Sequence, residues 1–153
     1  MKPIFRTIAI AILAGTAAMP SFAQTGQTQT YPALDDDALA QWGGEEGVRN
    51  WVESLFYYIM LDNRINHIFR EFGNIERQIF LNTQLEQMVL GGAVEYQGAS
   101  MAAAHADLGI TVTQFNAVVE AAYNACERVV VTYEACNQLI AALAPLERVI
   151  VTR

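Results

Sequence analysis

Hydrophobic residues along this chain recur every three or four positions, the spacing that lines them up on one face of a helix. One stripe occupies residues 48–60, and Asp62 with Asn63 is expected to end that helix. Two further stripes follow at residues 115–126 and 139–150. Because these apolar residues do not alternate as they would in a half-buried strand, the pattern predicts an all-α bundle.

Two local signals mark where these helices begin and bend. Thr111 and Gln114 have the spacing of a capping box, in which each side chain satisfies a backbone N–H group of the other residue. A helix is therefore expected to begin at this point. Pro145 lies inside the last stripe and predicts a kink, because proline has no backbone N–H group to donate.

The segment from residue 74 to residue 90 carries an unusual polar pair. Its apolar face is interrupted by Gln78 and Asn82, which lie one helical turn apart. A buried amide without a partner costs roughly 1 to 3 kcal/mol. The two amides are therefore expected to meet each other, water or a ligand. The alternative is that they bond to neighbouring backbone or lie at the edge of the helix.

The first 23 residues have the composition of a secretory signal peptide. Lys2 and Arg6 precede an apolar run that is too short to span a bilayer, and residues 21–23 offer the small side chains that a signal peptidase requires. Residues 24–35 are expected to be a flexible lead-in, and residues 36–153 a single domain. The mature protein is expected to be periplasmic or secreted, with no membrane insertion after cleavage.

The charge balance argues against a nucleic-acid partner. The full chain has 9 basic and 16 acidic residues, a formal net charge of -7. Removal of residues 1–23 takes away two basic residues, so 7 minus 16 leaves -9. Binding to phosphates requires concentrated Lys and Arg, and this chain has no basic cluster.

Only two histidines, His67 and His105, are present, so a single-histidine metal site has only these two candidates. His105 lies in the weakly charged segment 91–110, GGAVEYQGASMAAAHADLGI, which opens on two glycines. The spacing alone leaves open whether His105 is a metal ligand or a satisfied core or surface histidine.

An ordered set of short motifs runs roughly from residue 38 to residue 151. It comprises Gly43 to Gly47, Leu61, Asp62, Phe69, Gly91, Gly92, Glu95, Tyr96, Gly98, Met101, Ala104, His105, Leu108 to Thr111, Phe115, Val118, Val119 and Ala141 to Leu146. Together these motifs resemble the truncated haemoglobins of group I. The resemblance implies a truncated globin-like 2-on-2 α-helical sandwich around a haem b. No Cys-x-x-Cys-His motif occurs, so the haem is expected to be held non-covalently.

The resemblance also assigns roles to individual residues. His105 would be the proximal ligand of the haem iron, and Met101 would belong to the same proximal segment. Phe69 would pack on the porphyrin, and Val118 would press on the proximal side. Gln78 and Asn82 would lie at ligand-facing positions on the helix over the open face of the haem.

The chain departs from the family pattern at the position that faces bound gas. Phe56 stands where the family usually has a tyrosine that donates a hydrogen bond to dioxygen. A shift of one residue would instead make Tyr57 the donor.

A second departure concerns the haem propionates, for which the family often supplies a basic residue. Leu81 occupies that position here, and Arg77 or Tyr96 is expected to compensate. His67 is expected to be a surface residue, with a role as a second iron ligand as the alternative.

Cys126 and Cys136 are the only cysteines, on two consecutive helices. In an oxidising compartment such a pair is expected to form a disulfide. Two buried thiols are the alternative.

The function implied is that of a secreted b-type haem protein that reversibly binds a diatomic gas, with dioxygen or nitric oxide as the ligand and carbon monoxide as a probe. One alternative is a haem enzyme, either a nitric oxide dioxygenase or a peroxidase-like protein, which would need an unidentified reductase. Another is a haem-free helical interaction module, because a fold does not fix a function.

Overall fold

Four long helices make up most of the chain that the computed structural model describes, namely residues 30–35 and 37–153. They are α2 (Gly44–Leu61), α4 (Ile75–Val89), α6 (Val112–Val129) and α7 (Tyr133–Leu143). The shorter elements are α1 (Ala38–Gln41), α3 (Asn66–Glu71), α5 (Met101–Ala104), the 3-10 helix η1 (Ala144–Leu146) and α8 (Glu147–Ile150). The described residues contain no strand, which confirms the all-α prediction for this part of the chain. The expected signal peptide, residues 1–23, lies outside the described residues.

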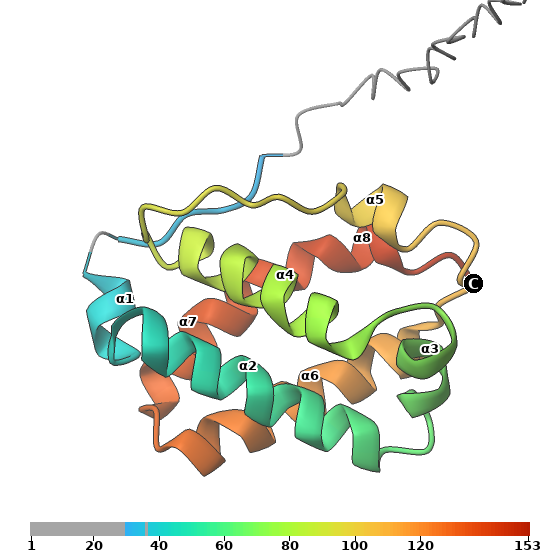
Figure 1. Cartoon of the computed structure of the whole chain (residues 1–153), viewed down its shortest axis with the longest axis horizontal. Coiled ribbons are helices and arrows are strands. Elements are labelled where there is room, and N and C mark those ends of the chain that lie inside the picture. The colour runs from blue at the N-terminus through green and yellow to red at the C-terminus, as the bar shows by residue number, and fades with distance from the viewer. Residues whose placement is uncertain (1–29, 36) are drawn as a thin grey trace, which may run out of the picture.

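The long helices form two layers. In Figure 1, α2 and α4 lie nearer the viewer, with α6, α7 and α8 behind them. α2 packs most extensively on α6 and also contacts α4, while α7 contacts both α4 and α6. This is the 2-on-2 helical sandwich that the sequence predicted.

The core forms where a bulky helix face meets a face of alanines. The buried side of α2 carries Val48, Trp51 and Leu55, whereas the buried side of α6 carries alanines such as Ala117 and Ala125. Since alanine side chains are small, α6 leaves room for the larger residues of α2. Trp51 also fixes the pairing, because its Nε1 donates to the carbonyl oxygen of Ala122 at 3.3 Å.

The predicted helix boundaries are confirmed. α2 ends at Leu61 with Asp62 as the capping residue. Thr111 and Gln114 form both hydrogen bonds of a capping box at the start of α6. The chain leaves the α-helix for η1 at Ala144, one residue before Pro145, and α8 begins at Glu147, so the expected kink is a short break.

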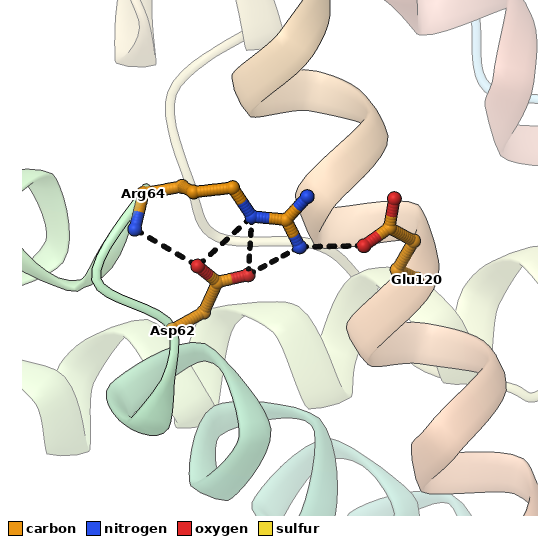
Figure 2. A network of polar contacts seen from close by, with 3 residues as sticks. All are labelled: Asp62, Arg64 and Glu120. Carbon is orange, nitrogen blue, oxygen red and sulfur yellow. Dashed lines mark hydrogen bonds and ion pairs between the residues drawn. The ribbon is translucent and has the colours of Figure 1, made fainter.

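Arg64 ties the turn after α2 to α6. Its guanidinium donates to both carboxylate oxygens of Asp62 and also to Glu120 on α6 (Figure 2). The hydrogen bonds from Arg64 hold the pKa of Asp62 below its ordinary value. Because Arg64 and Glu120 are exposed, we expect the network to set the geometry of the turn and to add little stability.

The short stretch before α1 runs without helix along the end of α4. The backbone N–H of Leu34 donates to the carbonyl oxygen of Val89 at 2.7 Å. The ring of Tyr31 meets that of Tyr96 edge to face, with 5.6 Å between ring centroids. In the described part of the expected lead-in, residues 30–35, the chain thus packs on the helical domain; residues 24–29 lie outside the description.

The structure joins Cys126, near the end of α6, to Cys136 on α7 by a disulfide. The two α-carbons are 6.1 Å apart, within the range that a disulfide spans. No helix in the described ranges is long and apolar enough to cross a membrane.

Replacement of both cysteines by alanine is expected to lower the free energy of unfolding by about 2 to 3 kcal/mol, because the closed loop is short. Urea denaturation of the double variant and of the wild type measures the difference. Mass spectrometry of protein from an oxidising compartment should find no alkylatable thiol without reductant. Two alkylated cysteines under those conditions would contradict the pairing.

Candidate functional site

A cavity of about 320 Å³ is lined by side chains from both helical layers. This volume is within the range of sites that bind small molecules and cofactors. Most of its wall is apolar. The residues singled out from the sequence that line it are His105, Phe69, Gln78, Asn82, Phe56, Met101, Val118 and Tyr96. Arg77 and His67 are exposed and do not belong to this wall.

His105 caps the C-terminus of α5, and a hydrogen bond to the backbone of Met101 holds its ring in one tautomer. Its Nδ1 lies 2.8 Å from the carbonyl oxygen of Met101. A carbonyl only accepts, so Nδ1 carries the proton and Nε2 keeps a free lone pair when the ring is neutral. Burial lowers the pKa of His105, and the bond to Met101 opposes that effect. The neutral ring with an oriented Nε2 is the form in which histidine binds a metal.

Gln78 and Asn82 line the cavity from α4, as their one-turn spacing suggested. Gln78 Nε2 donates to the carbonyl oxygen of Phe69 at 3.4 Å. Asn82 Nδ2 donates to the backbone oxygen of Gln78 at 2.9 Å. Each amide nitrogen has a second N–H, and the buried Oε1 of Gln78 has no partner. The amides therefore bond to neighbouring backbone, which was the second possibility, and both side chains also line the cavity.

Phe56 lies at the cavity, whereas Tyr57 points away from it. The Phe56 ring is buried and packs edge to face on Phe69, with ring centroids 5.7 Å apart. Tyr57 is 47% exposed, and the guanidinium of Arg128 lies 4.3 Å from the centre of its ring. In this structure α2 thus turns Phe56, and not Tyr57, toward the cavity, so neither residue places a tyrosine hydroxyl there.

Arg77, which was expected to pair with a haem propionate, does not line the cavity. Leu81 lines the cavity, and Arg77 is exposed one helical turn before it. Burial raises the pKa of Tyr96 to about 12, and the positive charge of Arg77 partly opposes this increase. Arg77 therefore lies close enough to influence a group on the wall. The Tyr96 hydroxyl donates to the carbonyl oxygen of Ala99 at 3.1 Å.

Glu86 also lines the cavity, although the sequence analysis did not single it out. It is 3% exposed, and its Oε2 has no hydrogen-bond partner. Burial alone raises its pKa to about 8. The sequence feature that could have identified Glu86 is its spacing, because Glu86 continues the i, i+4 series of Gln78 and Asn82. These three residues form one row on α4, which we call the polar ridge.

Part of the chain is similar in sequence to known truncated hemoglobins. No family model matches the chain. The group 1 truncated hemoglobin of Tetrahymena thermophila is 30% identical over 78 residues, which are 51% of this chain and 64% of that protein. The corresponding protein of Tetrahymena pyriformis is 28% identical over 78 residues, with the same coverage. The matched region therefore spans a little less than two thirds of these relatives.

Solved structures show the same fold over a longer part of the chain. The crystal structure of truncated hemoglobin from Tetrahymena pyriformis in the Fe(III) form aligns with a TM-score of 0.71 and 22% identity. The alignment covers 76% of this chain and 98% of that one. The 2/2 hemoglobin of a Synechococcus species, in the cyanomet state with covalently attached heme, aligns with a TM-score of 0.70. The chain thus has the fold of the truncated 2/2 haemoglobins.

Proposed function

We propose that this protein is an exported b-type haem protein that reversibly binds a diatomic gas, with His105 as the proximal ligand of the iron. The observation that carries the proposal is the fixed tautomer of His105 on the wall of an apolar cavity. Its Nε2 is the atom that would bind the iron. The similarity to truncated hemoglobins supports the same assignment.

The residues around the cavity fit such a group. A single imidazole supplies one iron ligand, and a porphyrin supplies four nitrogens. Phe69, Met101 and Val118 offer apolar contacts for the faces of the macrocycle. Arg77, at the outer side of α4, would pair with a propionate. The cysteines are joined to each other, so a non-covalently held haem b suits this chain.

The haem, when bound, supplies an iron coordination position that takes dioxygen, nitric oxide or carbon monoxide. The remaining N–H groups of Gln78 and Asn82 would donate to that ligand. Phe56 has no polar atom to contribute and would exclude water from the gas. A reversible binder with modest hydrogen bonding to dioxygen follows from this arrangement.

Export is the part of the proposal that rests on residues 1–23. Their composition is that of a signal peptide, which would place the mature protein in the periplasm or outside the cell. The disulfide suits such an oxidising compartment.

The absorption spectrum of the purified mature protein tests the haem assignment. We expect a Soret band, and haem-depleted protein should take up one equivalent of haemin. Absence of both would overturn the proposal and leave the haem-free interaction module. Sustained consumption of nitric oxide in the presence of dioxygen and an added reductant then separates a nitric oxide dioxygenase from a reversible binder, because only the dioxygenase turns over repeatedly.

Substitution of the cavity residues that would face the bound gas should change the rate of dioxygen release. Gln78→Leu or Asn82→Leu should speed release by up to roughly tenfold, since a neutral hydrogen bond contributes about 0.5 to 1.5 kcal/mol. Phe56→Tyr should slow release, because it adds a donor at the cavity. Laser photolysis and ligand replacement measure these rates.

Tyr57→Phe is the matched control for Phe56→Tyr. It removes a hydroxyl from a side chain that is 47% exposed and points away from the cavity, so release should not change. Faster release in Tyr57→Phe, with no effect of the other three substitutions, would show that the register of α2 around the gas is different.

A further inference from the structure

Glu86 is a carboxyl group on the cavity wall without a partner for one of its oxygens. It is 3% exposed, and its Oε2 is buried with no hydrogen bond. It belongs to the polar ridge with Gln78 and Asn82, each of which bonds to backbone as described above. Glu86 lies four residues beyond Asn82 and eight beyond Gln78, which places it roughly 6 Å and 12 Å further along the helix axis. It therefore stands at the far end of the row from Gln78 and one turn from Asn82.

Among the described residues, the elements packed on this half of α4 supply no compensating charge to Glu86. They are α2, α7, the loop after α4 and the stretch before α1, and their charged side chains are exposed. These side chains are Asp35, Glu45, Glu46, Arg49, Glu53, Glu95 and Glu134. The other titratable groups on the cavity wall are Tyr96 and His105, and both are uncharged at neutral pH.

A carboxylate in such a place would be costly, because burial of an unpaired charge carries a penalty of several kcal/mol. The neutral acid avoids that penalty, and burial raises the pKa of Glu86 to about 8 accordingly. A neutral acid still has an O–H donor and acceptor lone pairs. If they stay unpaired in an apolar wall, they cost about 1 to 3 kcal/mol.

We propose that Glu86, as a neutral carboxylic acid, forms a second subsite of the cavity that binds a small uncharged hydrogen-bonding molecule of the water and hydrogen peroxide class. Such a molecule both donates to the carbonyl oxygen of the acid and accepts from its O–H group. An anion is disfavoured, since no arginine lines the wall in the described ranges. The subsite goes beyond the gas site proposed above and does not depend on bound haem.

Infrared spectroscopy of the purified mature protein tests the subsite directly. Labelling the wild type with ¹³C-glutamate identifies the carbonyl band of a protonated Glu without any substitution. At pH 6 we expect this band at the position of a hydrogen-bonded acid, and we expect it to disappear on titration with a midpoint of about 8. Glu86→Gln should remove the band. Glu95→Gln, the same change at an exposed carboxyl, should leave it unchanged.

Methanol serves as the probe, because it is small, uncharged and chemically inert toward the protein. Its addition should shift the Glu86 band saturably as it replaces the resident molecule. A band at the position of an unbonded acid would overturn the subsite. A band of a hydrogen-bonded acid that does not shift with methanol would also overturn it, because it would indicate a partner within the protein. The absence of any band of a protonated Glu at pH 6 would overturn it as well. None of these results depends on a Soret band, so failure of the haem proposal is recognised separately.

Discussion

His105→Ala is expected to abolish or severely weaken haem retention, because it removes the Nε2 atom that we assign to the iron. The neighbouring wall, including Phe69 and Met101, remains and would give only apolar contacts. The Soret band of the purified variant and its haemin affinity measure the effect. In the wild type, resonance Raman spectra of the ferrous protein should show an iron-histidine stretch that is missing in the variant.

His67→Ala is the matched control for this result, since it makes the same change in the only other histidine. His67 is exposed on α3 and should leave the spectrum intact. Retention of the Raman band in His105→Ala together with its loss in His67→Ala would show that the iron is held from another side of the domain.

Glu86→Gln is expected to stabilise the protein by an amount that depends on pH. The pKa of Glu86 is about 8 in the folded protein against an ordinary value of 4.5, so the folded state holds a proton that the unfolded state has already released. Stability of the wild type therefore falls as the pH rises through this window, relative to a variant with no ionisable group there. The advantage of Glu86→Gln should be small near pH 4.5, grow with pH, and level off above about 8 at a value on the order of several kcal/mol.

Urea denaturation of Glu86→Gln and wild type across that pH range measures the effect. Glu95→Gln is again the control, because its exposed carboxyl should give a difference that stays flat with pH. A flat difference for Glu86→Gln as well would mean that Glu86 is ionised or paired in the folded protein.

Much of the helical architecture follows from local signals in the sequence. Thr111 and Gln114 define the start of α6 because a capping box requires only four consecutive residues. The apolar stripe of α2 and its end at Asp62 are equally local. The residues that would face the gas are harder to predict from the sequence. Neighbours such as Phe56 and Tyr57 point about 100 degrees apart on the helix, and only packing decides which of them is buried.

Glu86 shows why part of the site is hard to predict, because its i, i+4 spacing marks a helix face but not how deeply that face is buried. A helix with one buried face would leave the residues around it partly exposed, yet residues 83–87 are all buried. The loop after α4 covers the outer side of this half of the helix, where the backbone N–H of Gln97 donates to Gln84 at 3.1 Å. On another side, Gln87 donates to the backbone of Glu45 in α2 at 3.2 Å. Helical periodicity carries no information about a covering loop.

Because residues 30–35 pack on the helical domain, a shortened version of the protein should include them. A shortened chain starting at residue 36 would lose the Leu34 N–H that satisfies the carbonyl oxygen of Val89. It would also uncover part of the ring of Tyr96, a residue of the cavity wall, by removing the Tyr31 ring. Expression tags and fusion partners are therefore better joined upstream of residue 30, so that a cut made to simplify the protein does not alter the wall whose ligand is being measured.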